Sequence, residues 1–566
     1  MTQRGKAPWS LLALFVALAL VIGACQAQPG GGPVATATPA AADQADPNGE
    51  LVTNLGSEPD TIDPHRASFV GEISVIMSVF EGLMTLDPAT LKPVPAVAAK
   101  EPEVSADAKT WTFTIRDGVK FSDGTPVTAK DFERGFLRTC DPKTAGEYSF
   151  VLYIIEGCEK WNGMDAKSAT PAELDAAKAA TGVKASADGK TLTFKLTESA
   201  GYFGSIAYMW VGMPVQQKSL DQGGDKWTEP ATYIGNGAFK MTEWKHNEKM
   251  VFERNDGYWR GAPKLKKWTR VMINEGAVAF AAYRNNELDV FGAAAEDLRT
   301  VDSDAELKAQ AKDVPGSCTF YVGFNTRKAP FDDVNTRLAF ARAYNRDAFI
   351  TDVQKIGAPA NGGFIPPGFP GYDKDDPSQR FDAAAAKAAL TASKYNGKPE
   401  IQNVKFTYSS NARTKTRVEW LQQQWKANLG IDVVPDPVDS TAYTQLVKKP
   451  ETLPLMFILG WCADFPHQQN WLTTVFHSAS LSRTGWKNDQ FDSLVKKADQ
   501  DTNKENADKT YLEASRILSK EAPAAWLYYN AGKTLTKPWV KGVTTTAIDA
   551  ALGQFRLWEI FVTKKG

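Results

Sequence analysis

The feature that most restricts the fold of this chain is its length combined with the absence of an internal repeat. Its 566 residues are more than one hydrophobic core supports, and at about 100–200 residues per domain they predict about three or four domains. No segment recurs at a spacing of about 20–50 residues, which excludes solenoids and propellers. The chain therefore divides into several domains, each with its own hydrophobic core.

Strand and helix patterns are mixed along the whole chain. Residues 111–116 and 191–196 alternate strictly between apolar and polar types, as half-buried strands do. Thr128 is a suitable N-cap for a helix at 129–137, with Asp131 in its first turn. Later patterns predict strands at 320–325 and 404–408 and helices at 334–350 and 417–428. This mixture predicts an α/β fold of mixed α+β character.

The N-terminus has the pattern of an export signal. Arg4 and Lys6 precede an apolar run over residues 9–22, followed by Gly23, Ala24 and Cys25. The run is too short to span a membrane comfortably, and small residues directly before a cysteine resemble a bacterial lipobox. We therefore expect a lipoprotein signal peptide at 1–24 and acylation of Cys25, which would anchor the protein to the membrane; a plain secretory signal is the alternative.

Residues 25–48 consist almost entirely of Gly, Pro, Ala, Thr, Gln and Asp. This composition cannot bury a core, so we expect a disordered tether. An exported protein also favours disulfides over free thiols. Four cysteines follow the tether and permit three pairings: Cys140, Cys158, Cys318 and Cys462.

Several function classes are disfavoured by composition and motifs. A net charge of -1 gives no basic excess for binding nucleic acid. The four histidines form no His-Glu-x-x-His cluster, and there is no Gly-x-Ser-x-Gly nucleophile motif, which argues against a secreted hydrolase. His467 and His477 form a weak candidate metal pair, but solvated loop histidines explain them better. We expect neither a cofactor nor a metal.

The best local candidate for a binding site follows an apolar run at 455–459, which we expect to be a buried strand ending at Gly460. Asp464 comes next, with Trp461 and Phe465 on either side and no basic residue nearby. A carboxylate among aromatic side chains is costly to desolvate unless a cation meets it. That cation belongs either to a ligand or to a distant Lys or Arg.

Motifs from residue 50 to the C-terminus resemble, in order, the bacterial extracellular solute-binding proteins of family 5. The most specific stretch is Trp111 to Asp131, and the others are Glu58 to His65, Phe80 to Leu83, Asn236 to Phe239, Glu253 to Asn255, Tyr258-Trp259, Glu287 to Asp289, Phe324-Asn325, Pro330 to Asp333, and Gly485 to Asn488 with Phe491-Asp492. The resemblance implies a two-lobed, type II periplasmic-binding-protein-like fold with an extra subdomain in the first lobe. The expected boundaries are lobe I at 49–80, 211–317 and 533–566, the extra subdomain at 81–210, and lobe III at 318–532.

Within the family, Trp461 to Asp464 is most similar to the oligopeptide-binding proteins of Gram-negative periplasms. The resemblance implies that Asp464 receives a peptide α-ammonium and that Tyr148 contacts the ligand. It also implies a Cys318–Cys462 disulfide, which leaves Cys140 to pair with Cys158. The remaining candidate ligand-binding residues are Gly460, Cys462, Ala463, Trp461 and Trp486.

One departure from those relatives concerns charge. Where they place an arginine and a glutamate that pair in the pocket, this chain has Ile458 and Ser68. Replacing both members of a buried ion pair leaves no uncompensated charge. Because this chain lacks the pair, the resemblance does not predict which residues hold the far end of the ligand.

The expected function is that of a receptor, not an enzyme. The resemblance implies a monomeric, lipid-anchored, extracytoplasmic or periplasmic protein that captures peptides between its lobes and delivers them to the permease of an ABC transporter. Other members of the family bind dipeptides, oligosaccharides or nickel complexes, and these ligands remain alternatives.

Overall fold

The computed structural model describes residues 44–294, 296–355, 359–360, 362–439, 442–443, 446–447, 450–549 and 552–565. The predicted signal peptide, Cys25 and the tether up to Asp43 lie outside the described residues. Of the helices that are described, none combines the length and the apolar character needed to cross a bilayer.

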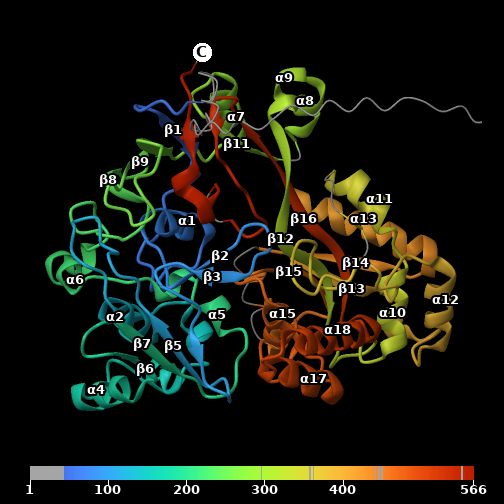
Figure 1. Cartoon of the computed structure of the whole chain (residues 1–566). Helices are drawn as coiled ribbons and strands as arrows, with labels where there is room; N and C mark the ends of the chain where they lie inside the picture. Colours follow the sequence, from blue (N-terminus) through green and yellow to red (C-terminus); the bar gives the residue numbers. More distant parts are fainter. Residues whose placement is uncertain are drawn as a thin grey trace, which may run out of the picture. The chain divides into compact units, whose positions relative to one another are not determined.

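A ten-stranded mixed sheet forms the framework, in the order β14-β13-β15-β12-β16-β11-β1-β10-β9-β8 (Figure 1). Its strands are β1 (Glu50–Asn54), β8 (Phe239–Lys245), β9 (Lys249–Arg254), β10 (Lys267–Val271), β11 (Val290–Ala293), β12 (Ala311–Phe324), β13 (Val404–Ser409), β14 (Val433–Val438), β15 (Met456–Cys462) and β16 (Ala524–Thr536). We call β8, β9, β10, β1 and β11 the first half of the sheet, and the other five strands the second half. β1 is parallel to β10 and β11, and β13 is parallel to β14 and β15, whereas the remaining pairs are antiparallel.

The two halves of the sheet meet through the long strands β12 and β16, which lie side by side in Figure 1. β16 pairs with β11 through Lys533 to Thr536 and with β12 along most of its length. The register between β12 and β16 shifts between Pro315 and Thr319. Gly316 is required there, because a Cβ on it would lie 2.1 Å from Oδ1 of Asn530.

Helices cover both faces of the second half, because its strands alternate between two cores. On β12, Val322 belongs to a core with Trp425, whereas Tyr321 belongs to a core with Trp471. The helices that follow β12 are α10 (Val334–Arg342), α11 (Arg346–Ala348), α12 (Ala383–Ala392), α13 (Ala412–Leu429), α15 (Gln468–Trp471), α16 (Thr473–Phe476), α17 (Asp489–Gln500) and α18 (Lys504–Glu521).

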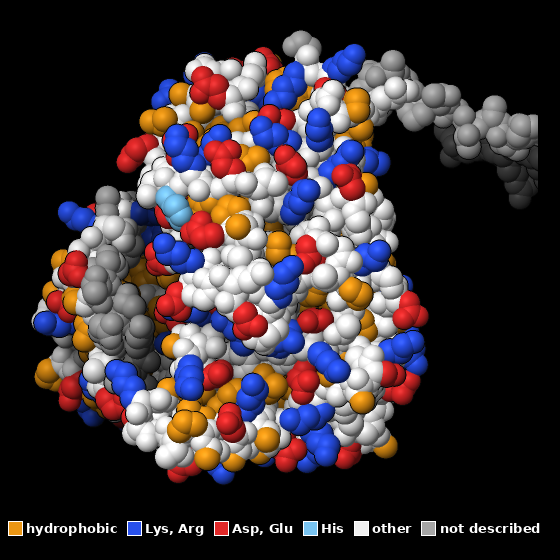
Figure 2. Space-filling view, turned by 90° about the vertical axis from the view of Figure 1, so that its left-hand side faces the viewer, with side chains coloured by type: hydrophobic (Ala, Val, Ile, Leu, Met, Phe, Trp, Pro, Cys, Tyr) orange, Lys and Arg blue, Asp and Glu red, His pale blue; other side chains and the backbone are white. Residues whose placement is uncertain are grey.

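The first half of the sheet carries shorter helices and a C-terminal ribbon. These elements are α1 (Val70–Val79), α6 (Gln217–Gly223), α7 (Gly276–Arg284), α8 (Leu298–Ser303), α9 (Ala305–Gln310), β17 (Val540–Lys541) and β18 (Phe561–Val562). The short helix α5 (Phe203–Ile206) instead packs against the smaller sheet described next, where Phe203 contacts Trp111 and Phe194. On the face shown in Figure 2, Lys and Arg side chains are interspersed with Asp and Glu. This distribution matches the net charge of -1, and the described residues of that face form no broad basic area.

A separate four-stranded sheet, in the order β4-β5-β7-β6, lies in the region of the predicted extra subdomain. The elements of this region are β2 (Met84–Leu86), β3 (Pro93–Pro95), β4 (Glu103–Val104), β5 (Thr110–Thr114), α2 (Ala129–Cys140), the short 3-10 helix η2 (Ser149–Leu152), α3 (Cys158–Asn162), α4 (Pro171–Ala180), β6 (Val183–Ala185) and β7 (Thr191–Lys195). A disulfide between Cys140 and Cys158 joins the end of α2 to the start of α3, as predicted.

A buried carboxylate ties the loop after β1 to α2. The two carboxylate oxygens of Asp63 accept hydrogen bonds from Arg138 at 3.0 Å each, and Trp227 Nε1 donates to Oδ2 at 3.0 Å. Burial alone would raise the pKa of Asp63, but the interactions with His65 and Arg138 outweigh it and hold the pKa below its usual range. The Asp63-Pro64-His65 motif thus has a structural role between two parts of the chain.

The sequence predictions were confirmed where the local pattern is strong. Strands 111–116 and 191–196 correspond to β5 and β7, and the helix after Thr128 is α2. Thr128 donates its backbone N–H to Asp131 Oδ2 at 2.9 Å, which stabilises the helix start.

Four boundaries were wrong. The helix predicted at 417–428 begins at Ala412, because Asn411 caps it by accepting from the N–H of Thr414. The helix predicted at 334–350 ends at Arg342, since Asn345 caps a new helix by accepting from the N–H of Ala348. The strand predicted at 320–325 begins at Ala311, because β16 provides pairing partners for a polar, Gly- and Pro-containing segment. The strand predicted to end at Gly460 continues to Cys462, because Cys318 of β12 still pairs with it.

We predict that Arg138→Met destabilises the protein by about 3–5 kcal/mol, because it leaves Asp63 buried without its counter-charge. The free energy of unfolding in urea measures this effect. Lys130→Gln, an exposed substitution on the same helix, should change stability by no more than about 0.5 kcal/mol. A loss below about 1 kcal/mol for Arg138→Met would contradict the assigned role.

Candidate functional site

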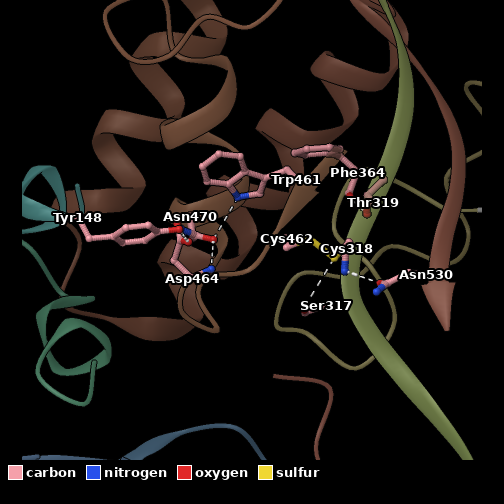
Figure 3. Close-up of a disulfide and its surroundings, with 10 residues drawn as sticks. All are labelled: Tyr148, Ser317, Cys318, Thr319, Phe364, Trp461, Cys462, Asp464, Asn470 and Asn530. Atoms are coloured by element: carbon pink, nitrogen blue, oxygen red, sulfur yellow. Dashed lines mark hydrogen bonds between the residues drawn. A yellow bond between two sulfur atoms is a disulfide. The ribbon is translucent and has the colours of Figure 1, made fainter. Parts of the chain in front are cut away.

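Asp464 lies two residues beyond β15, on the loop that leads to α15 (Figure 3). Its carboxylate accepts hydrogen bonds from the hydroxyl of Tyr148 at 3.0 Å and from Nδ2 of Asn470 at 2.9 Å. Its backbone carbonyl accepts from the hydroxyl of Tyr208 at 3.0 Å. The loop is therefore held by side chains from distant parts of the chain, including Tyr148, which the sequence analysis names as a ligand contact.

Asn470 organises the site. Its Oδ1 accepts from the backbone N–H of Asp464 at 3.0 Å and from Nε1 of Trp461 at 3.2 Å, so its Nδ2 is directed at the carboxylate (Figure 3). The sequence analysis missed Asn470 and Tyr208. An asparagine six residues after the aspartate carries no local signal, and the approach of Tyr208 depends on tertiary packing.

Burial raises the pKa of Asp464 to about 6, although the hydrogen bonds from Asn470 and Tyr148 act in the opposite direction. Burial, together with the negative charge of Asp464, also raises the pKa of Tyr148. Among the described residues, no Lys, Arg or His forms an ion pair with Asp464. The carboxylate is thus desolvated and hydrogen-bonded but lacks a positive partner from the described chain, which suits it to receive a cation.

The strand before Asp464 is fixed by its neighbour β12. Cys318 and Cys462 face each other in the ladder and form the second predicted disulfide. Gly460 leaves room for Phe320, since a Cβ on it would lie 2.8 Å from that ring. Beyond the strand, Ala463 donates its N–H to the carbonyl of Ser317 at 2.8 Å. These contacts set the position from which Asp464 projects.

The predicted site residues do not all meet. Trp461, Ala463 and Asp464 are partly exposed, and Cys462 is exposed. Trp486 is only 4% exposed and packs against Phe491 of α17, with ring centroids 5.0 Å apart, in the hydrophobic core beside β12. The structure therefore places Trp486 in a core rather than beside the carboxylate.

The structure also shows what surrounds Ile458 and Ser68, the two positions that differ in charge from the oligopeptide-binding relatives. Ile458 is buried in the core on one face of the second half of the sheet, so an apolar side chain suits that place. Ser68 donates its hydroxyl to Glu147 at 2.8 Å, next to Tyr148. Neither position leaves an unpaired charge.

The histidines do not form a metal site in the described part of the chain, where no group of three or more His, Cys, Asp or Glu is suitably placed. His467 caps α15 by accepting from the N–H of Gln469, and burial lowers its pKa to about 4. It is thus neutral at pH 7 and its ring packs against Tyr202 and Tyr511.

Two cavities lie near the strand that carries Asp464. The first, about 260 Å³, is lined by Asp464 and Asn470 together with residues of the extra-subdomain region, and we call it the Asp464 cavity. The second, about 720 Å³, lies against β16 and is lined by residues of both halves of the sheet, and we call it the β16 cavity. Its lining includes Gln354, Arg417 and Tyr528.

The β16 cavity has a basic wall. Arg417 lies over the ring of Tyr528, 5.0 Å from its centroid, and donates from Nη2 to Oε1 of Gln354 at 3.0 Å. Nε of Arg417 and Nε2 of Gln354 are buried without a hydrogen-bond partner among the described residues. Buried donors left unpaired are costly, and burial accordingly lowers the pKa of Arg417. This wall is suited to an anionic or carbonyl-bearing group.

The family model for bacterial extracellular solute-binding proteins, family 5, matches residues 92–482. The chain belongs to this family. The E. coli (strain K12) periplasmic oligopeptide-binding protein OppA is 30% identical over 508 residues, which cover 87% of this chain and 89% of that protein. The family 5 assignment therefore rests on most of the sequence.

Solved structures of related proteins share the fold. The unliganded open form of MppA, a periplasmic murein tripeptide-binding protein, matches with a TM-score of 0.77 at 27% identity, covering 92% of this chain and 98% of that one. Haemophilus influenzae OppA in complex with RPPGFSPFR matches with a TM-score of 0.68 at 27% identity, covering 92% and 100%. The two-lobed α/β fold expected for a family 5 protein is confirmed, and the chain is a solute receptor rather than an enzyme.

We predict that Tyr148→Phe raises the pKa of Asp464 above about 6, because the lost hydrogen bond stabilises the ionised form. The carboxyl resonance of Asp464, followed by NMR during a pH titration, measures the shift. Tyr153→Phe is the matched control, since the Tyr153 hydroxyl donates to Asn162 instead. An unchanged or lower pKa in Tyr148→Phe would refute the assigned contact.

Proposed function

We propose that this family 5 receptor captures peptides by their α-ammonium group at Asp464 and delivers them to the permease of an ABC transporter. The observation that carries the proposal is the partly buried carboxylate of Asp464, hydrogen-bonded by Asn470 and Tyr148 and without a basic partner among the described residues. A peptide ammonium supplies the missing positive charge in a charge-assisted hydrogen bond. The relatives named for oligopeptides and for a murein tripeptide support this ligand class.

The far end of the ligand is proposed to reach the basic wall of the β16 cavity. From Asp464 the path runs about four residues back along the direction of β15, to the level of Tyr528, and crosses two strand spacings of about 4.8 Å to β16, so the span is on the order of 15 Å. An extended peptide covers about 3.3 Å per residue, so about three to five residues fill this distance. Arg417 and Gln354 then receive the terminal carboxylate or the last carbonyl groups.

This geometry disfavours the alternative ligands. A neutral oligosaccharide offers no ammonium group to Asp464, and an extended dipeptide of about 7 Å does not reach from Asp464 to Arg417. A nickel complex has no cluster of ligating side chains among the described residues. Main-chain hydrogen bonds to an extended peptide would give affinity with little dependence on side chains.

We further propose the domain boundaries that the resemblance implies: lobe I at 49–80, 211–317 and 533–566, the extra subdomain at 81–210 and lobe III at 318–532. The register shift of β12 near Pro315 lies at the proposed boundary between lobes I and III and is the proposed hinge. Ligand binding would shift the population toward a closed state. The receptor is proposed to act as a monomer outside the cytoplasm, tethered through acylated Cys25.

We predict that Asp464→Asn weakens the binding of Ala-Ala-Ala about 10- to 150-fold, because the charge-assisted hydrogen bond is worth about 1.5–3 kcal/mol. Isothermal titration calorimetry at pH 7.5 measures this loss. N-acetyl-Ala-Ala-Ala, which lacks the ammonium, should bind the wild-type protein just as weakly.

The control for this experiment is Asp256→Asn, which removes an exposed carboxylate that pairs with Arg254 at the surface. Its affinity for Ala-Ala-Ala should equal that of the wild type. Equal binding of the free and acetylated peptides would refute the ammonium role of Asp464.

We also predict that Arg417→Gln weakens the binding of peptides with a free C-terminus more than the binding of their C-terminal amides, because the guanidinium group favours a carboxylate. Calorimetry with Ala-Ala-Ala-Ala and its amide gives the ratio of affinities, which should fall by about tenfold or more in the variant. Lys415→Gln, an exposed substitution on the same helix, is the control. An unchanged ratio places the carboxylate elsewhere.

A further inference from the structure

The two disulfides of the described chain differ in their exposure to solvent. Cys140 and Cys158 are both 0% exposed, so their disulfide is enclosed by the protein. Cys318 is 8% exposed, but its partner Cys462 is exposed, so the second disulfide is open to solvent on one side. Thiol–disulfide exchange requires access to a sulfur, and exposed disulfides are the labile ones in proteins. A thiol in solution should therefore reduce Cys318–Cys462 and leave Cys140–Cys158 intact.

The exposed disulfide lies where the ladder between β12 and β15 ends. Cys318 and Cys462 form the last pair of that ladder. Among the described residues Cys318 has no partner in β16, because the register of that pairing shifts between Pro315 and Thr319. The backbone N–H of Cys318 donates instead to Oδ1 of Asn530 at 2.6 Å. The disulfide thus secures an end of the sheet that has few ladder hydrogen bonds of its own.

Asp464 depends on this end of the sheet. It follows Cys462 by two residues, and Figure 3 shows the carboxylate and the disulfide on the same stretch of chain. Ala463, between them, donates its N–H to the carbonyl of Ser317 at 2.8 Å. Opening the disulfide leaves this hydrogen bond at a free strand end, so Asp464 gains mobility. The hydrogen bond from Asn470 to Asp464 does not involve β12 and remains, so the loop loosens without unfolding.

The exchange reaction balances with a low-molecular-mass thiol as the reductant. The thiolate of the first thiol attacks Sγ of Cys462, a new S–S bond forms, and the Cys318–Cys462 bond breaks with its electron pair on Sγ of Cys318. Ser317 Oγ lies 3.9 Å from that sulfur, where its hydroxyl can donate to the leaving thiolate (Figure 3). A second thiol attacks the mixed disulfide, which frees Cys462 and releases the two thiols joined as one disulfide. The protons of the two thiols pass to Cys318 and Cys462.

Resting on the proposed peptide-binding function, we propose that Cys318–Cys462 is a site of thiol–disulfide exchange that controls peptide binding at Asp464. The oxidised form holds Asp464 where it receives the ammonium group of the ligand, and reduction by a low-molecular-mass thiol weakens binding. Because coupling between two equilibria is reciprocal, a bound peptide opposes reduction by the same factor. The reverse exchange, with the oxidised form of the thiol, restores the receptor.

Alkylation of the mature protein tests the selectivity of the exchange. The protein is treated with dithiothreitol at pH 7.5, trapped with iodoacetamide at intervals and analysed by peptide mass mapping. Cys318 and Cys462 should be alkylated at least about fivefold faster than Cys140 and Cys158. A smaller ratio overturns the proposal.

Calorimetry at pH 7.5 with Ala-Ala-Ala tests the effect on binding. Selectively reduced protein should bind at least about threefold more weakly than oxidised protein, and reoxidation with oxidised dithiothreitol should restore the affinity. The Cys318→Ser/Cys462→Ser variant should reproduce the weak binding, whereas Cys140→Ser/Cys158→Ser is the matched control and should bind like the wild type. Circular dichroism verifies folding of each form. A smaller loss of affinity on reduction, or unfolding of the reduced wild-type protein, overturns the proposal.

A redox titration tests the reciprocal effect. In a buffer of reduced and oxidised dithiothreitol, the equilibrium fraction of protein with Cys318–Cys462 reduced should fall when Ala-Ala-Ala saturates the protein. A disulfide that only stabilises the fold, without coupling to the site, would leave this fraction unchanged, and that result overturns the proposal.

The design separates two failures. If the oxidised protein does not bind Ala-Ala-Ala, the peptide-receptor function and its redox control are both refuted. If the oxidised protein binds Ala-Ala-Ala, and Asp464→Asn weakens binding but reduction does not, the receptor function stands and the redox control alone is refuted.

Discussion

The pairing of β12 with β15 on one side and β16 on the other is the constraint on which the rest of the structure depends. Cys318 stands opposite Cys462, so the disulfide locks the register two residues before Asp464. A slip of one residue would turn every side chain of β15 to the opposite face, exchanging Ile458 and Trp461 between their two environments. The carboxylate is thus positioned by a strand ladder and not by its loop alone.

A carboxylate in such a place is costly for the fold. Desolvation raises the pKa of Asp464, and the protein offsets that cost with donors from Asn470 and Tyr148 instead of a built-in cation. This contrasts with Asp63, where Arg138 compensates the charge within the protein. A compensated carboxylate stabilises a fold, whereas one that is only hydrogen-bonded retains attraction for a cation from outside.

The sequence predicted those parts of the fold and site whose causes are local. Thr128 and Asp131 mark a helix start, and the residues around Asp464 carry a motif similar to that of the oligopeptide binders. What it did not predict depends on tertiary pairing. Residues 311–317 become strand because β16 lies beside them, and Asn470 and Tyr208 reach the aspartate loop through packing that no local pattern encodes. The sequence predicts Trp486, which is apolar and lies in a family motif, as a ligand contact, whereas in the structure it packs in a hydrophobic core.

The hydrogen bond between Tyr148 and Asp464 joins residues 316 positions apart in the chain. Tyr148 lies in the proposed extra subdomain and Asp464 in proposed lobe III, so this bond joins the two proposed domains. A hydrogen bond to a charged group contributes about 1.5–3 kcal/mol, enough to bias a lobe equilibrium by itself. Glu198 and Gln500 make a second contact across the same boundary.

A peptide ammonium that binds Asp464 beside Tyr148 would add a hydrogen bond and not replace those already present, because the two carboxylate oxygens of Asp464 have lone pairs beyond those used by Tyr148 and Asn470. Closure of the lobes and binding of the peptide would then each stabilise the other through the carboxylate of Asp464.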